Sequence, residues 1–163
     1  MEAYFGLPAS QVSIFYLSQI EKQYAGKWID IDLWDPGDTG DLTADLEILQ
    51  PTTGGYTPAT FYVATVTGTS IPANFSCGPP SAGRQTIRTS NGDPNQSGIY
   101  NGQWLRLCLQ VPNNYTAPKP SGEPFDGGWY KVRYTMGSGG SPATDLTSWR
   151  VTIRDNPVHL VTP

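Results

Sequence analysis

Apolar and polar residues alternate with a period of two in several short segments of this chain. The clearest segment is 28–34, where Ile29, Ile31 and Leu33 fall on one side of an extended chain. The opposite side carries Trp28, Asp30, Asp32 and Trp34. Successive side chains of a strand point to opposite faces, so this pattern predicts a strand with one face in a core.

The same alternation predicts further strands at residues 13–19, 44–49, 61–66, 104–111, 129–134 and 149–154, with edge strands at 4–7 and 158–161. Turn residues separate these segments: Thr53–Tyr56 and Tyr100–Gln103 have the Gly-Gly and Asn-Gly sequences of tight reversals. We therefore expect an all-β fold, a jelly-roll-like β-sandwich of about seven to nine antiparallel strands.

Helix signals are weak by comparison. Residues 18–25 could form at most one short helical turn, ended by Gly26. Residues 72–96 and 112–128 are rich in Ser, Gly, Pro and Asn, which predicts two long loops.

The length of 163 residues suits one domain spanning residues 1–163. No apolar run is long enough to cross a bilayer, and the segment after Met1 lacks the features of a signal peptide. We expect a fragment of a larger secreted protein, with no membrane insertion of this fragment.

Acidic and basic residues are unevenly distributed along the chain. Residues 28–82 hold six Asp and Glu47 but no Lys or Arg, so with a net charge of −4 the remainder carries +3. A region this acidic repels phosphate backbones and anionic lipids, which excludes nucleic acid as an expected partner. A cation fits the acidic region better.

The chain has two cysteines, Cys77 and Cys108. Cys108 alternates with the aliphatic residues of segment 105–111, so we expect it on the outer face of its strand. Cys77 lies in a predicted loop that could reach across that face. We predict a disulfide between the two, worth about 3–4 kcal/mol through the loop that it closes. The alternative is a pair of free thiols in a reducing compartment.

The densest group of acidic residues is the Gly-rich segment 30–45. Its carboxylates are Asp30, Asp32, Asp35, Asp38, Asp41 and Asp45. Calcium takes six to eight oxygen ligands, and a Gly-rich loop with an Asp at every third residue can surround such an ion. We predict a calcium site here, with a solvated Asx-rich turn as the alternative.

At this point the sequence resembles a known type of domain. Segments 15–20, 24–38, 44–51, 128–134 and 147–154 are similar to an extracellular domain of bacterial surface proteins, many of them like the minor pilins of tight-adherence pili. The central motif is Ala25-Gly-Lys-Trp-Ile-Asp-Ile-Asp-Leu-Trp-Asp-Pro-Gly-Asp38. The pre-peptidase C-terminal sandwich, whose Asp-rich turn can hold calcium, is a looser likeness. The resemblance implies an envelope-attached, non-catalytic module at the cell surface.

Catalytic signals are few. His159 is the only histidine, and it lies near the chain end without the other residues of a hydrolase triad beside it in a recognisable pattern. Carboxylates such as Glu47, Glu123 and Asp126 leave a glycan hydrolase as a distant third interpretation.

Four tryptophans lie on the sides of their predicted strands that face away from the core: Trp28, Trp34, Trp104 and Trp129. Indole rings beside carboxylates suit sugars, so carbohydrate binding is the alternative to our leading prediction. That prediction is a non-enzymatic, extracellular structural or adhesion module whose partners are other domains or subunits of a surface assembly.

Overall fold

The computed structural model describes residues 2–6, 12–34, 44–67, 85–89, 103–136 and 146–155. Ten strands lie in these ranges: β1 (Glu2–Gly6), β2 (Val12–Gln19), β3 (Trp28–Trp34), β4 (Ala44–Thr52), β5 (Gly55–Pro58), β6 (Tyr62–Thr67), β7 (Thr86–Thr89), β8 (Gln103–Gln110), β9 (Trp129–Met136) and β10 (Leu146–Arg154). A single 3₁₀ turn, η1 (Lys22–Tyr24), joins β2 to β3. Within the described residues, no helix is long and apolar enough to span a membrane.

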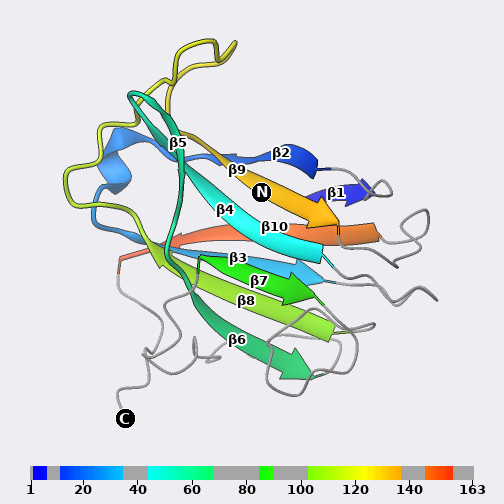
Figure 1. Cartoon of the computed structure of the whole chain (residues 1–163). Helices are drawn as coiled ribbons and strands as arrows, with labels where there is room; N and C mark the ends of the chain where they lie inside the picture. Colours follow the sequence, from blue (N-terminus) through cyan, green and yellow to red (C-terminus); the bar gives the residue numbers. More distant parts are fainter. Residues whose placement is uncertain are drawn as a thin grey trace.

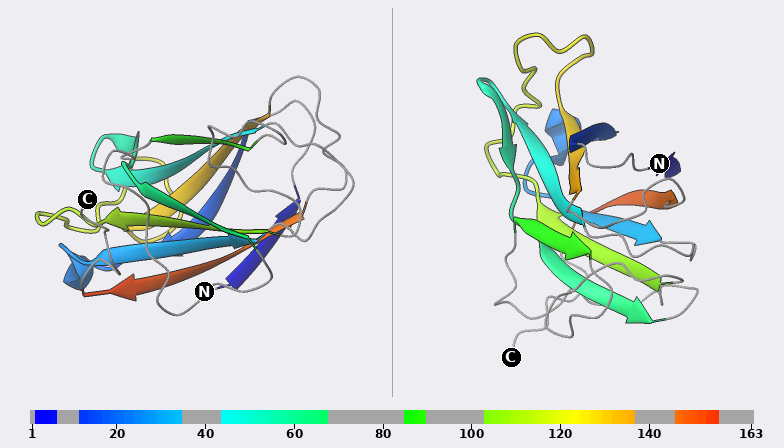
Figure 2. Two further views of the ribbon diagram at one scale, coloured as in Figure 1. Left: turned by 90° about the horizontal axis from the view of Figure 1, so that it is seen from below. Right: turned by 45° about the vertical axis from the view of Figure 1, so that its right-hand side comes forward.

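The strands form two antiparallel sheets that face each other (Figures 1 and 2). Sheet A has the order β1-β10-β3-β8-β6, and sheet B has the order β2-β9-β4-β5, with β7 also paired to β4. The fold is therefore the all-β sandwich expected from the alternation. Early strands lie beside late ones, β1 beside β10 and β2 beside β9. A jelly roll requires such interleaving, and its full topology stays a prediction.

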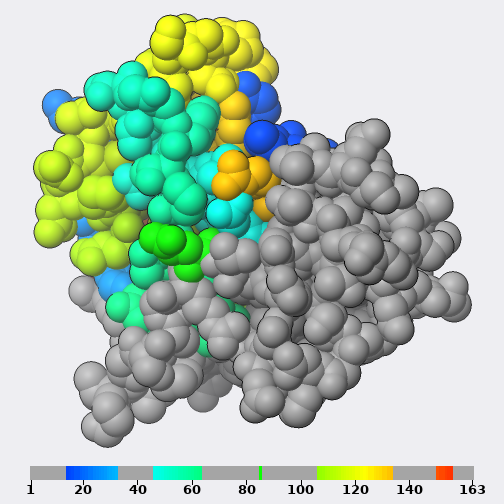
Figure 3. Space-filling view, in the orientation of Figure 1, coloured from blue at the N-terminus to red at the C-terminus, as the bar shows by residue number. Residues whose placement is uncertain are grey.

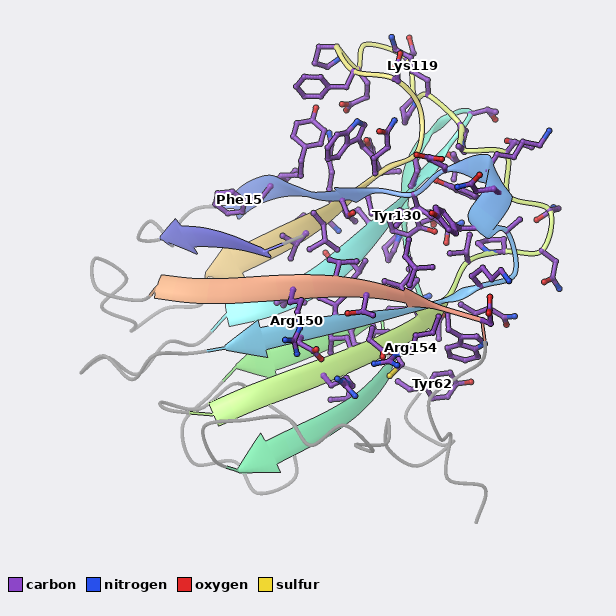
Figure 4. All side chains as sticks on the ribbon, turned by 180° about the vertical axis from the view of Figure 1, so that it is seen from behind. Phe15, Tyr62, Lys119, Tyr130, Arg150 and Arg154 are labelled. Carbon is purple, nitrogen blue, oxygen red and sulfur yellow. The ribbon has the colours of Figure 1, made fainter. Side chains whose placement is uncertain are left out.

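The core lies between the inner faces of the two sheets. Its fully or almost fully buried members include Ile29, Ile31, Leu46, Ile48, Phe61, Leu107, Leu109, Tyr130 and Val132. The two members from β3, Ile29 and Ile31, are residues that the alternation assigned to the core side. Figure 4 shows Tyr130 pointing into the space between the sheets.

Most strand predictions are confirmed within a few residues. The strand expected at 28–34 has those same bounds, and the reversal at Thr53–Tyr56 joins β4 to β5 with Thr52 opposite Gly55. The turn predicted within 18–25 is shorter than expected, because Ser18 and Gln19 continue β2 and only Lys22–Tyr24 are helical. The strand predicted at 158–161 and the hairpin turn at Asn101–Gly102 lie outside the described residues.

Two strands were not predicted, β5 and β7. Each has four residues, β5 ends at a proline, and β7 lies inside the segment that we expected to be a loop. Both strands pair with β4, β7 with its first half and β5 with its last residues. So short a segment has little alternation of its own, and its pairing depends on the neighbouring strand.

The long segment 111–128, of which 112–128 was predicted as a loop, closes one end of the sandwich (Figures 1 and 3). Hydrogen bonds and close backbone contacts hold it in place. Gly128 donates to the Pro118 carbonyl and accepts from Ile20, each at 2.9 Å. The Tyr115 hydroxyl donates to the Ile20 carbonyl at 2.9 Å. A Cβ on Gly127 would lie 2.1 Å from the Ala117 carbonyl oxygen, so only glycine permits this close approach. The segment is therefore a fixed part of the fold.

Candidate functional site

The outer face of sheet A carries four of the residues that the sequence nominated: Trp28, Asp30, Asp32 and Cys108. The strand register places Asp32 between Arg106 on β8 and Arg150 on β10, and Asp30 between Cys108 and Thr152. Arg154 lies two residues after Thr152 in β10, opposite Trp28. We call Asp30, Asp32, Arg106, Arg150 and Arg154 the charged layer. In Figure 4, Arg150 and Arg154 lie on the sheet A side of the molecule, far from Lys119.

Both aspartates of the charged layer are buried and paired with arginines. Asp32 Oδ1 accepts from Arg106 Nε at 2.7 Å, and its Oδ2 accepts from Arg106 Nη2 at 3.2 Å and Arg150 Nη2 at 3.1 Å. Asp30 Oδ2 accepts from Arg154 Nε. Asp30 is 0% exposed and Asp32 1%. The face that we expected to be open to solvent at these two positions is therefore closed by cross-strand ion pairs.

The charges of the layer stabilise each other. Burial by itself would lower the pKa of Arg106, but the hydrogen bonds and charge of Asp32, together with the charge of Asp30, raise it above its ordinary value. Arg106 thus stays a cation in a buried position. One atom is not satisfied: Asp30 Oδ1 is buried and makes no hydrogen bond. A buried oxygen without a partner costs about 1–3 kcal/mol, which the pair with Arg154 must offset.

These ion pairs reduce the set of ligands available to the predicted calcium site, because they include Asp30 and Asp32. Both oxygens of Asp32 and Oδ2 of Asp30 are paired with arginines within sheet A, so cations already occupy those contacts. Asp35, Asp38 and Asp41 lie outside the described residues, and Asp45 is described only in its backbone, opposite Thr135 and Arg88. The described part of the chain contains no group of three or more metal-binding side chains. A calcium site formed by Asp35, Asp38, Asp41 and Asp45 stays a prediction.

The four outward tryptophans do not share one surface. Trp28 is on the outer face of sheet A as predicted, but it is buried, with its ring centroid 6.0 Å from that of Tyr62. Trp34 and Trp104 are opposite each other in β3 and β8, and their side chains lie outside the described residues. Trp129 is in sheet B. Trp28 and Trp129 therefore belong to different sheets, and carbohydrate binding through the outward tryptophans stays a prediction.

Cys108 is on the outer face of sheet A, as its alternation with the leucines predicted. It packs with Trp28 and Tyr62 in a small cluster separate from the main core, and it is not a free cysteine. Its expected partner Cys77 lies outside the described residues. The position of Cys108 agrees with a cross-link over this face.

A second group of side chains, on the outer face of sheet B, was not predicted. Tyr16 of β2, Trp129 of β9 and Phe125 of the segment 111–128 bring their rings together, and we call them the aromatic cluster. The centroid of Tyr16 lies 5.0 Å from that of Phe125 and 5.6 Å from that of Trp129, and both contacts are edge-to-face. The centroids of Phe125 and Trp129 are 5.9 Å apart.

Glu123 and Lys131 form a polar border beside the aromatic cluster. Glu123 accepts hydrogen bonds of 2.5 Å from the Tyr16 hydroxyl and from Lys131 Nζ. The Lys131 ammonium also lies 4.8 Å from the ring centroid of Tyr16 and 4.3 Å from that of Tyr56, which are cation–π distances. Burial, followed by the charge of Glu123, raises the pKa of Tyr56 to about 12. This tyrosine therefore stays neutral at ordinary pH.

The structure also describes the three carboxylates for which a glycan hydrolase was kept as an interpretation. Glu123 is bound by Lys131 and Tyr16, and Glu47 pairs with Arg133 on the neighbouring strand. Asp126 is exposed beside Phe125. Two of these three groups therefore have cationic partners in the structure.

The pairing of Glu123 predicts a pH dependence of stability. Hydrogen bonds from Lys131 and then Tyr16 hold the pKa of Glu123 below its ordinary value of 4.5. A carboxyl whose pKa is lowered by folding adds stability above its unfolded-state pKa and loses it as the pH falls through the folded-state value. We expect Glu123→Gln to lower the free energy of unfolding by about 1–2 kcal/mol near pH 7, and this deficit to shrink below about pH 4.5.

Urea unfolding of both proteins between about pH 3 and pH 7 measures this difference. The exposed Glu21 provides the control, because Glu21→Gln should leave the profile unchanged. Parallel profiles for the wild type and Glu123→Gln would contradict the assignment of a stabilising role to this carboxylate.

The sequence contained signals for both groups. Arg106 falls in the same outward set as Cys108, and Arg150 and Arg154 fall in the outward set of segment 149–154, so opposite charges were available on one sheet face. Tyr16 is likewise outward in segment 13–19. What the sequence lacked was the strand order, which decides that β3 lies between β8 and β10.

Comparison of the chain with protein-family models, with curated proteins and with solved structures finds no match. The likeness to tight-adherence pilins and to the pre-peptidase C-terminal sandwich therefore stays an expectation from the motifs.

Proposed function

We propose that this chain is a non-catalytic, extracellular module of a bacterial cell-surface or pilus-associated assembly. The charged layer carries the proposal. Its two buried aspartates are paired with arginines of the adjacent strands, an arrangement that suits a structural sheet better than a reaction centre. In a catalytic site, titratable groups would instead face a cleft with pKa values suited to proton transfer.

The proposal also includes two cross-links, one disulfide and one bound calcium ion. A disulfide between Cys77 and Cys108 would tie the segment around Cys77 to the outer face of sheet A, beside Trp28 and Tyr62. Calcium bound by Asp35, Asp38, Asp41 and Asp45 would fix the segment between β3 and β4. What supports the first is that Cys108 is not a free cysteine, and what supports the second is the ligand chemistry of the aspartates.

Thermal unfolding of the full chain tests both cross-links. We expect a reducing agent to lower the melting temperature of the wild type and to leave unchanged a variant that combines Cys77→Ser and Cys108→Ser. We expect a chelator to lower the melting temperature of both proteins, but not that of a variant combining Asp35→Asn and Asp38→Asn. A wild type that is insensitive to the reducing agent would remove the disulfide, and one insensitive to chelation would remove the calcium.

The location needs a separate measurement. Intact cells that make the full-length natural protein are treated with a membrane-impermeant amine reagent. Labelling of this domain in intact cells is expected, because Lys27 and Lys119 are solvent-accessible. Labelling only after lysis would contradict the proposal.

A further inference from the structure

We infer that the aromatic cluster of Tyr16, Phe125 and Trp129 is a binding site for a neutral saccharide. The inference concerns the outer face of sheet B, and it holds or fails independently of where the domain is located. It differs from the tryptophan-based site expected from the sequence, since only Trp129 is shared.

The three rings form a partly exposed surface patch and are not a small buried core. Phe125 is 49% exposed and contacts the rings of Tyr16 and Trp129, so it belongs to a contiguous aromatic patch and is not an isolated surface residue. The ring planes of Tyr16 and Phe125 meet at 78°, and those of Tyr16 and Trp129 at 76°. Edge-to-face contacts leave ring faces uncovered by the neighbouring ring. An exposed aromatic face is the surface against which the apolar C–H side of a sugar ring packs.

The polar groups beside the rings suit hydroxyl groups. Each oxygen of the Glu123 carboxylate accepts one hydrogen bond from the protein, so each can accept a second. Gln19, opposite Trp129 in the register, donates its amide to the Gly127 carbonyl at 3.0 Å. Its amide oxygen makes no hydrogen bond within the described part of the chain, and so can accept one from a ligand. These acceptors lie next to the aromatic faces, as sugar binding requires.

Charge decides between a neutral and an ionic ligand. The Glu123 carboxylate is neutralised by Lys131, which the rings of Tyr16 and Tyr56 further stabilise. The Glu123–Lys131 pair therefore presents hydrogen-bonding groups without a net charge, although the exposed Asp126 lies next to Phe125 in the chain. An uncharged, hydroxyl-rich ligand matches this border better than a phosphorylated or strongly acidic one.

The site is also held in place before a ligand arrives. Phe125 and Glu123 belong to the segment whose close backbone contacts at Gly127 and Gly128 fix its path. The Tyr16 hydroxyl is bonded to Glu123, which ties β2 to that segment. Little ordering is then needed on binding, and this lowers the entropic cost of association.

Calorimetric titration of the full chain tests the site. The probes are hexasaccharides of β-1,4-linked glucose, β-1,4-linked N-acetylglucosamine, β-1,4-linked xylose and α-1,4-linked glucose. We expect at least one of them to bind, and Phe125→Ala to weaken that binding at least about tenfold, whereas Phe125→Tyr keeps it. Phe125 is exposed, so circular dichroism should show both variants folded.

Ile14 supplies the matched control, since it is an apolar residue of β2 that is 52% exposed and outside the aromatic cluster. Ile14→Ala should leave the affinity unchanged. Failure of every probe to bind at millimolar concentration, equal losses in Phe125→Ala and Ile14→Ala, or binding that Phe125→Ala leaves intact would each overturn the inference. None of these results bears on the disulfide, the calcium or the surface location, so the two proposals fail separately.

Discussion

Replacing Asp32 by Asn is expected to lower the free energy of unfolding by about 3–5 kcal/mol. Asp32 is the acceptor for Arg106 and Arg150, and the Arg106 side chain is only 4% exposed. Without the carboxylate, the guanidinium of Arg106 keeps its charge in a buried position and loses the charge-assisted hydrogen bonds to Asp32. Urea unfolding at neutral pH measures the change, as a shift of the midpoint at constant slope.

Two variants show whether burial is the cause. Asp155 also pairs with a cation, Lys27, but its side chain is 80% exposed and the pair is screened by solvent, so Asp155→Asn should leave the stability almost unchanged. Combining Asp32→Leu with Arg106→Met removes both buried charges, and this double variant should regain much of the lost stability. A loss in Asp32→Asn as small as that in Asp155→Asn would refute the stabilising role of the charged layer.

The second large effect is expected in the core, at Tyr130. This residue is almost fully buried between the sheets, with its ring centroid 6.1 Å from that of Tyr115. Tyr130→Ala removes an aromatic ring and leaves a cavity, so we expect a loss of about 3–5 kcal/mol. Chemical unfolding monitored by circular dichroism measures it.

Tyr130→Phe is the matched control, because it removes only the hydroxyl. That hydroxyl is buried and makes no hydrogen bond, so its desolvation is not compensated. We expect Tyr130→Phe to be as stable as the wild type or more stable by about 1 kcal/mol. A loss above about 1 kcal/mol would mean that the hydroxyl has a partner, against the structure.

The charge asymmetry of the sequence has a structural explanation in the charged layer. Residues 28–82 are rich in acidic groups and lack Lys and Arg, whereas the later part of the chain carries an excess of basic groups. Strand β3 comes from the acidic part, and β8 and β10 come from the basic part. Their adjacency in sheet A brings Asp30 and Asp32 against Arg106, Arg150 and Arg154. Three acidic residues of the acidic part, Asp30, Asp32 and Glu47, are thus paired in space with arginines of the later part.

The sequence by itself determined eight of the ten described strands, and in β3 and β8 it also determined which face enters the core. In β3 and β8 the alternation is long enough to distinguish the two faces, because successive side chains point in opposite directions whatever the neighbouring strands are. It also placed Cys108 away from the core and correctly predicted that little helix is present.

Only the tertiary structure decided what those outer faces do. Asp30 and Asp32 were nominated as calcium ligands because their local sequence is acidic, but their partners are arginines more than 70 residues away in the chain. Tyr16, Phe125 and Trp129 become neighbours only when segment 111–128 packs beside β2 and β9. Side-chain direction is a local property of a strand, whereas partner identity depends on strand order, which long-range packing sets.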